Sequence, residues 1–156
     1  MALRKILNDK EPALHKVCKS VTSFDAKLHT LLDDMRETLI DSGGVGLAAP
    51  QVGILRRVVL VDTEEEILEL VNPELVETRG EQEGVEGCLS VPGKYGWVKR
   101  PYYATVRAQD RYGNWYEVEG EELIARCFCH ELDHLDGILY TQIMDRFLTE
   151  EELEKF

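Results

Sequence analysis

The sequence has 156 residues, of which 44% are hydrophobic and 31% charged, a balance typical of a single globular domain. The formal net charge of −12 argues against a DNA or other nucleic-acid partner, because non-specific binding of that kind needs a basic face. The first twenty residues carry charges instead of the apolar run of a secretory signal, and no stretch approaches the roughly 20 apolar residues of a membrane span. We therefore expect a cytoplasmic protein with no membrane partner.

The first predicted element is a helix at residues 24–40, where apolar side chains recur at helical spacing. Thr22 or Ser23 fits the N-cap of this helix, because a hydroxyl oxygen accepts a hydrogen bond from the first free N–H groups. Such a pattern predicts an amphipathic helix that packs its apolar side on the core. Residues 42–53 follow as a loop of small residues.

The middle of the chain predicts strands. Residues 57–62, 67–71 and 75–78 are rich in β-branched and aliphatic side chains, and Asn72-Pro73 separates the last two segments. Alternating patterns predict two more strands at residues 103–109 and 115–118, and the segment 110–114 between them reads as a hairpin turn.

A last helix is predicted at residues 121–135, with Gly120 before it and Gly137 ending it. Runs of strands flanked by two helices indicate an α+β class and not an alternating parallel sheet. We expect small antiparallel or mixed sheets packed around this C-terminal HExxH helix, together with the N-terminal amphipathic helix.

The predicted last helix contains His130-Glu-Leu-Asp-His134. Histidines at positions i and i+4 lie on one helix face, so both imidazoles can bind the same divalent ion. Glu131 lies about 100° around the helix from His130 and can act as a general base on a metal-bound water.

A catalytic site of this kind needs a third protein ligand. The glutamates at residues 150–152 are one option, as in a zincin-type metallopeptidase, and the cysteines are the other. Cys127 shares the stripe of His134 but lies roughly 10 Å from it along the helix axis, so we interpret it as a wall residue. Cys88 follows a glycine, which lets the backbone approach closely. The residues alone leave these alternatives open.

Three motifs in series resemble those of the bacterial type of the peptide deformylase family: Gly44-Val-Gly-Leu-Ala-Ala-Pro-Gln51, Glu86-Gly-Cys-Leu-Ser90 and His130-Glu-Leu-Asp-His134-Leu-Asp-Gly137. Their order and spacing also fit, and the resemblance covers nearly the whole chain. It implies a single catalytic domain over residues 1–156. The implied activity is a metal-dependent hydrolysis that removes the formyl group from the N-terminal formyl-methionine of new polypeptides and releases formate.

The resemblance also implies a ligand set. Cys88, His130 and His134 are the implied metal ligands, with one position left for water. The implied cofactor is one divalent ion, natively Fe²⁺, for which Zn²⁺, Ni²⁺ or Co²⁺ can substitute. The donor atoms themselves do not select iron, because thiolate and imidazole suit several metals.

Catalytic roles follow from the same resemblance. Metal-bound water is expected to attack the formyl carbon, with Glu131 as general base and later as acid to the leaving amine. The Gln51 side-chain amide and the Leu89 backbone N–H are the implied donors to the oxyanion.

Substrate contacts are implied at four further residues: Val45, Gly46, Gly87 and Cys127. Backbone edges at the glycines are expected to lie beside the substrate like an added strand, while Cys127 helps to line the methionine pocket. The implied partners are formyl-methionyl peptides and nascent chains, with transient proximity to the ribosome. The short acidic tail at residues 149–156 argues against docking there through a basic C-terminal helix.

Two alternatives compete with this interpretation. A zincin-type metallopeptidase predicts that Cys88→Ala keeps its metal while loss of a downstream glutamate does not. A non-catalytic metal-binding module predicts a closed site with a fourth protein ligand, which Cys18 or Cys129 has to supply.

Overall fold

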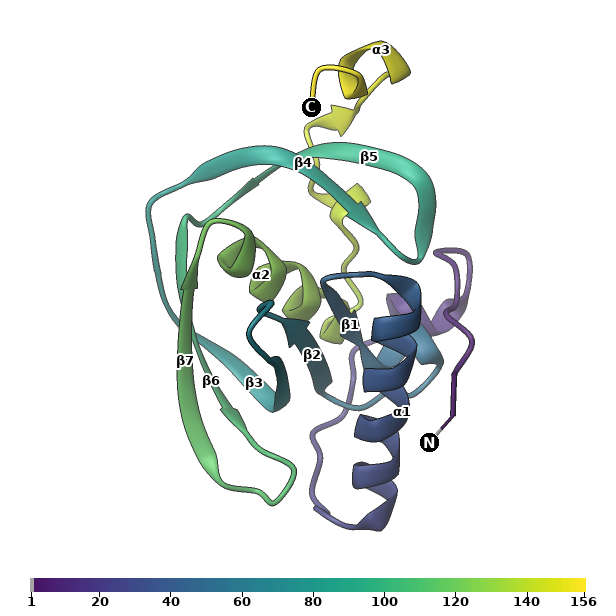
Figure 1. Ribbon diagram of the computed structural model, residues 1–156, viewed down its shortest axis with the longest axis vertical. Helices are drawn as coiled ribbons and strands as arrows, with labels where there is room; N and C mark the ends of the chain where they lie inside the picture. The colour runs from purple at the N-terminus through teal and green to yellow at the C-terminus, as the bar shows by residue number, and fades with distance from the viewer. Residues whose placement is uncertain (1) are drawn as a thin grey trace.

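A buried helix, α2 (Leu123–Leu135), lies at the centre of the molecule, between a five-stranded and a three-stranded sheet (Figure 1). The structure is a computed structural model and describes residues 2–156. Strands follow the order β1-β2-β3-β6-β7 in the larger sheet and β4-β5-β8 in the smaller one, and neighbouring strands are antiparallel. The predicted α+β class agrees with this arrangement. The strands span Gly46–Ala48 (β1), Val58–Asp62 (β2), Ile67–Arg79 (β3), Gln82–Cys88 (β4), Val91–Arg100 (β5), Tyr103–Gln109 (β6), Trp115–Glu121 (β7) and Arg146–Phe147 (β8).

Strand β2 divides the core into two layers. Its side chains alternate between the two faces of the sheet, so Val59 and Val61 join the core around α2 while Val58 and Leu60 join the core around α1. The two helices therefore cover opposite faces of the larger sheet. All four valine and leucine side chains are fully buried, which explains why this strand shows no polar alternation in the sequence.

Helix α1 (Ala26–Ser42) begins later than the sequence pattern predicts. The predicted cap at Thr22 or Ser23 is wrong, because Asp25 is the N-cap and its carboxylate accepts a hydrogen bond from the Leu28 N–H at 3.2 Å. An aspartate one residue before the first helical position satisfies the N–H at the third position, which the earlier hydroxyls cannot reach. Gly43 ends the helix with a left-handed φ of 70°.

The separation of two strands at Asn72-Pro73 is also wrong, because β3 runs continuously through both. Asn72 adopts a left-handed φ of 50°, and the register of β3 against β6 shifts at this point. The Asn72 side chain accepts from the Val21 N–H at 2.8 Å and donates to the Val21 carbonyl at 2.9 Å. A bulge held by side-chain hydrogen bonds thus replaces the predicted break.

The hairpin β4–β5 was not predicted as a pair of strands. It forms an arch over α2, and Leu89 and Ser90 make the tight turn between its strands (Figure 1). Four glycines and several charged residues interrupt any period-2 pattern in this segment. The differences elsewhere are small: β7 continues to Glu121, and α2 begins at Leu123 instead of residue 121. The predicted loop at residues 42–53 contains β1 and the 3₁₀ helix η2 (Ala49–Val52).

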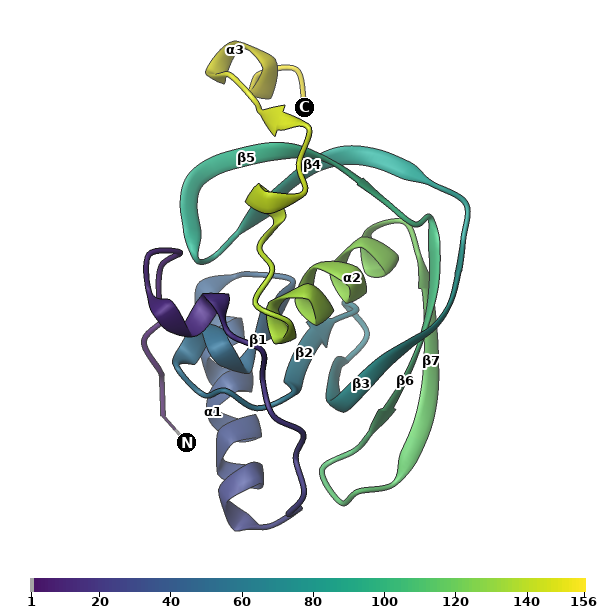
Figure 2. The same cartoon turned by 180° about the vertical axis from the view of Figure 1, so that it is seen from behind.

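A segment near the N-terminus packs against the segment that follows α2. Figure 2 shows the segment with the 3₁₀ helix η1 (Pro12–His15) beside the segment that follows α2 and carries η3 (Tyr140–Gln142). Leu14 packs with Leu139 and Tyr140 in a small third core. The last helix, α3 (Glu150–Leu153), projects from the far end of the molecule and buries none of its residues (Figure 1). No helix in residues 2–156 has the length and apolar character needed to cross a membrane.

Candidate metal centre and active site

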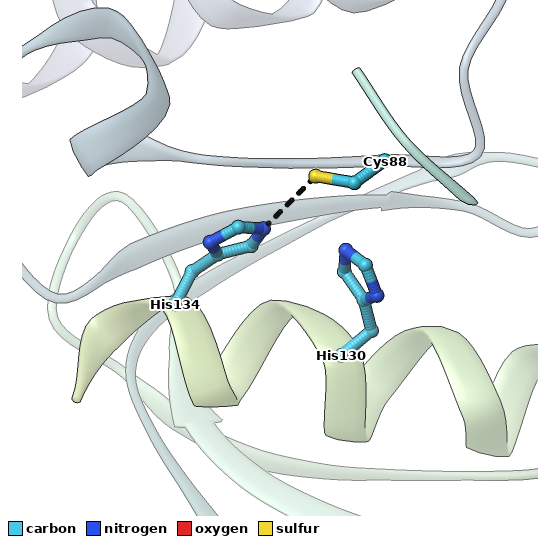
Figure 3. Close-up of side chains that lie close together, drawn as sticks. All are labelled: Cys88, His130 and His134. Atoms are coloured by element: carbon cyan, nitrogen blue, oxygen red, sulfur yellow. Dashed lines mark hydrogen bonds between the residues drawn. The ribbon is translucent and has the colours of Figure 1, made fainter. Parts of the chain in front are cut away.

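Cys88, His130 and His134 bring their ligand atoms together, all within 4.8 Å of one another (Figure 3). The two imidazoles come from successive turns of α2 and face Cys88, which ends β4. The Cys88 Sγ lies 3.4 Å from the His134 Nε2, and the two imidazole centroids are 5.0 Å apart. Both histidines are buried. Within residues 2–156 this is the one group of three such side chains, so the structure brings together the three predicted ligands.

Glu86, on β4, orients the first histidine. Its Oε1 lies 2.5 Å from the His130 Nδ1. Because a carboxylate only accepts hydrogen bonds, Nδ1 carries the proton and Nε2 keeps the lone pair that a metal needs. No partner is found for the buried Nδ1 of His134 among the described residues, so the two imidazoles are held in different ways.

The same glutamate joins a buried ionic network. Arg100 donates to both carboxylate oxygens of Glu86 at 2.6 and 3.1 Å, and Arg126 donates to one of them at 2.8 Å. Burial acts to raise the pKa of Glu86, but the hydrogen bonds from His130 and Arg100 outweigh it and hold the pKa at about 2. Glu86 is therefore ionised over the whole physiological range, and its charge is balanced by the cations around it.

Glu131 lies beside the three ligands. Its Oε2 is 4.0 Å from the His130 Nε2, and its Oε1 is buried with no hydrogen-bond partner among residues 2–156. Complete burial raises the pKa of Glu131 to about 7, although nearby His130 lowers it. Gly46 on β1 makes the close packing possible, since a Cβ at this position meets the Glu131 Oε2 at 2.6 Å and the Cys127 Sγ at 2.8 Å.

Gln51 reaches the site from η2 and is only 1% exposed. Its Oε1 accepts from the Ala48 N–H at 2.9 Å, which fixes the amide so that Nε2 points toward Cys88. That nitrogen donates to the Ser90 Oγ at 3.1 Å and lies 3.5 Å from the Cys88 Sγ. Gln51 is therefore buried, and its amide donor faces the predicted metal ligands.

A cavity of about 480 Å³ opens onto these residues. Of the predicted substrate contacts, Val45, Gly46, Gly87 and Cys127 all line it, as does Leu89. Burial raises the pKa of the Cys127 thiol well above its ordinary value, so this wall residue is neutral. Tyr95 also lines the cavity, and its ring covers Gly87, where a Cβ meets it at 2.8 Å.

The donor set suits a divalent ion. One sulfur and two imidazole nitrogens converge from rigid elements, and a buried carboxylate oxygen without a partner lies beside them. Neither Cys18 nor Cys129 belongs to this cluster, and the glutamates at residues 150–152 lie on the exposed α3. The cluster therefore offers three protein donors, one fewer than a closed structural site needs.

Glu86, Arg100 and Arg126 are the functional residues that sequence reasoning missed. Arg126 precedes His130 by four residues, so the two share a face of α2, and a charged residue on the buried face of a helix is a usable signal. Glu86 has no comparable signal, because a single glutamate before Gly-Cys carries no periodicity. Arg100 lies in the hairpin that was not predicted.

Comparison with known proteins identifies the family. The family model described as polypeptide deformylase matches residues 3–149. The peptide deformylase of Agathobacter rectalis is 57% identical over 142 residues, which cover 91% of this chain and 90% of that protein. The chain belongs to the polypeptide deformylase family. The resemblance of its three motifs to the deformylases is confirmed.

Solved deformylase structures share the fold. The peptide deformylase of Legionella pneumophila has a TM-score of 0.88 and 43% sequence identity, covering 99% of this chain and 95% of its own. The peptide deformylase of Thermotoga maritima has a TM-score of 0.89 and 37% identity, covering 92% of this chain and 98% of its own. Deformylases are metal-dependent enzymes that remove a formyl group from nascent polypeptides, and the Cys88, His130 and His134 cluster is a possible metal site for that chemistry.

Proposed function

We propose that residues 1–156 act as a single catalytic domain that hydrolyses the formyl group from the N-terminal formyl-methionine of nascent chains. The observation that carries this proposal is the convergence of Cys88, His130 and His134 beside a buried, partner-free Glu131 oxygen. A ligand cluster with an adjacent carboxylate is the arrangement that metal-assisted hydrolysis requires.

The three ligands hold one divalent ion, for which we propose Fe²⁺, with Zn²⁺, Ni²⁺ or Co²⁺ as substitutes. When bound, the ion supplies Lewis acidity, which makes water a better nucleophile near neutral pH and polarises the formyl oxygen. Glu86 supports this role of His130 by keeping the Nδ1 proton in place, which leaves Nε2 free to bind the ion.

Glu131 handles the proton. It takes the proton from the attacking water and passes it to the amine that leaves, so formate and a free methionine N-terminus are the products. A carboxylate whose pKa is raised by burial to about 7 can both accept and donate a proton near neutral pH. A cation beside Glu131 lowers that value and favours the base form at the start of the cycle.

Gln51 and Leu89 stabilise the oxyanion. The Gln51 Nε2 donor is fixed beside the ligands by the Ala48 N–H and Ser90 hydroxyl contacts of its amide, so it does not have to reorganise during the reaction. Leu89 lies in the turn directly after Cys88, and we assign its backbone N–H as the second donor.

Substrate binds along the outer edge of β1. Strand β1 is the terminal strand of the larger sheet, so its outer edge can accept an added peptide strand. No partner is found for the Val45 N–H among residues 2–156, and we assign this group to the substrate. Gly46 and Gly87 allow close backbone approach, and Cys127 lines the methionine pocket.

The place of action follows from the substrate. We propose a cytoplasmic enzyme that meets formyl-methionyl chains close to the ribosome. The acidic α3 carries Glu150, Glu151 and Glu152 in its first turn. These negative charges do not favour binding of α3 to the phosphate-rich surface of the ribosome. We therefore propose encounter by diffusion and no docking through the C-terminal segment, no DNA partner and no membrane partner.

The two alternatives fit the geometry less well. A zincin-type peptidase takes its third ligand from a carboxylate, whereas the exposed glutamates of α3 are remote from the histidines (Figure 1). A closed structural site needs a fourth protein ligand, and the cluster contains three.

Formate release tests the proposal. The protein, purified without oxygen and loaded with Fe²⁺ or Ni²⁺, is given a formyl-Met tripeptide, with an acetyl-Met tripeptide and an unblocked longer peptide as controls. We expect formate from the first peptide only, and its loss in Glu131→Ala at unchanged metal content. Cleavage of the longer peptide without formate supports the peptidase instead, and silence on all three with one bound metal supports a structural site.

A further inference from the structure

The catalytic cavity extends beyond the metal ligands along α2. Past Cys127, its wall continues to Arg126 and to Leu123 at the first turn of the helix, and Val85 on β4 also lines it. Arg126 lies one turn before His130, so its Cα is about 6 Å further along the helix axis. A side chain of methionine's length that starts near the metal reaches this part of the cavity.

Arg126 is buried, at 7% exposure, yet only part of its guanidinium is used. Nη1 donates to the Glu86 Oε2 at 2.8 Å and to the Val98 carbonyl at 3.2 Å. Nε and Nη2 have no hydrogen-bond partner among residues 2–156, and neither is sealed from solvent. Nη2 lies against Gly84 of β4, at 3.2 Å from the position of an added Cβ. Arg126 therefore lines the cavity with N–H donors on Nε and Nη2 that have no partner among residues 2–156.

Glu86 is the polar neighbour of Arg126 in this wall, and its carboxylate already pairs with Arg100, Arg126 and His130. Val85 and Leu123 are aliphatic, and the buried Cys127 thiol is neutral because desolvation raises its pKa well above the ordinary value. The Arg126 charge is already balanced by Glu86, so a neutral acceptor suits the free donors better than a second carboxylate. A neutral acceptor near the end of a four-atom side chain, on or at its third atom, meets these conditions.

We propose that Arg126 is a specificity-determining residue that hydrogen-bonds the end of the first residue's side chain, and that it extends the substrate range to formyl-methionine sulfoxide. The proposal rests on the deformylase function above. The thioether sulfur of methionine is a weak acceptor, whereas the sulfoxide oxygen is a strong one on a side chain of nearly the same length. Norleucine has the same length and no acceptor.

The test compares three formyl tripeptides that differ only in the first residue: methionine, methionine sulfoxide and norleucine. The variant is Arg126→Met, which keeps an unbranched side chain and removes the donors, while Arg100 and His130 still hold Glu86. Arg107→Met, at an exposed arginine stacked on Trp115, is the control for the loss of one charge.

We expect wild type to turn over the sulfoxide peptide with a kcat/KM within about tenfold of the methionine peptide. In Arg126→Met, the ratio of sulfoxide to norleucine kcat/KM falls by a further tenfold or more, and in Arg107→Met that ratio is unchanged. An equal loss on all three peptides shows a structural role for Arg126 and overturns the proposal.

Two further outcomes keep the test decisive. Absence of formate from the methionine peptide with wild type overturns the deformylase function itself, whereas normal turnover with an unchanged ratio overturns only the role of Arg126. If Arg126→Met does not fold, Arg126→Leu replaces it, because leucine also removes every donor at this position. Inhibition of wild type by unformylated peptides gives a second measure, in which the sulfoxide peptide has to bind more tightly than the norleucine peptide.

Discussion

Gly46 shows how one missing side chain positions a catalytic group. A Cβ there meets the Glu131 Oε2 at 2.6 Å and the Cys127 Sγ at 2.8 Å, so Gly46→Ala has to displace Glu131. We expect turnover of a formyl-Met tripeptide to slow by about two orders of magnitude, since small displacements of reacting groups have effects of that size. Circular dichroism and metal content control for loss of the fold or of the ligand cluster. Unchanged turnover in Gly46→Ala contradicts the steric argument.

In the proposed metal site, Glu86 acts on the metal through His130. In Glu86→Gln the acceptor for the His130 Nδ1 proton is weakened, and we expect metal affinity to fall by about 10- to 100-fold. Competition with a chelator of known affinity measures the change, and circular dichroism shows that the variant is folded. Asp133→Asn serves as the control, since Asp133 pairs with Arg100 at 2.7 Å without contacting His130. Metal affinity equal to that of wild type in Glu86→Gln rules out this role.

The sequence could place the two histidines and Glu131 near one another because HExxH has a fixed geometry on a helix. Cys88 was added to this group only through the resemblance, since its segment has no pattern of its own. Glu86 could not be predicted, because its partners Arg100 and Arg126 come from a hairpin and a helix that are joined only in the folded chain. A residue whose role depends on long-range contacts has no recognisable pattern in the sequence around it.

Among the elements, β3 depends on its bulge at Asn72. Asn72→Ala removes the hydrogen bonds to Val21 and Gln109. It also puts alanine, which tolerates a left-handed backbone less well than asparagine, at a φ of 50°. We expect the free energy of unfolding to fall by about 2–4 kcal/mol in urea titrations. Asn72→Gly removes the same hydrogen bonds but tolerates the backbone angle, so the difference between the two variants isolates the strain. A loss below about 0.5 kcal/mol in Asn72→Ala is incompatible with this account.

Periodicity also explains which elements were predictable. Helices α1 and α2 and the hairpin β6–β7 each present one apolar side, and their positions were predicted to within a few residues. The hairpin β4–β5 alternates poorly, because its glycines and charges serve the cavity and the ionic network. Secondary structure could therefore be predicted where core packing alone sets the residue pattern. It could not be predicted where the residues also serve the cavity and the ionic network.

At the level of the whole molecule, the carboxylate of Asp34 on α1 holds the N-terminal segment in place. Asp34 accepts from the Ala2 N–H at 2.8 Å and pairs with Arg4 at 2.9 Å, and these contacts hold the pKa of Asp34 below its usual value of 3.8. A carboxyl whose pKa is lowered by folding stabilises the protein above its unfolded-state pKa, and this contribution is lost as the pH falls through the folded-state pKa.

Asp34→Asn tests this linkage. We expect the variant to be less stable than wild type at pH 7 and the difference to shrink as the pH falls below about 4, toward zero in stronger acid. Urea unfolding at pH 7, 5 and 3 measures it. A difference that grows on acidification has the wrong sign and contradicts the assignment.

The origin of the ligands has a consequence for how the molecule holds together. Cys88 belongs to the hairpin of the smaller sheet and His134, 46 residues later, to the central helix, so an ion bound to both would link two parts of the fold (Figure 3). An ion that binds only the folded chain stabilises it by an amount that grows with occupancy and reaches about 2.7 kcal/mol at a hundredfold excess over Kd. Chelation should therefore speed amide hydrogen exchange in β4 and β5 more than in β6 and β7. Loss of the ion would then remove the proposed reacting centre and at the same time loosen the β4–β5 hairpin above it.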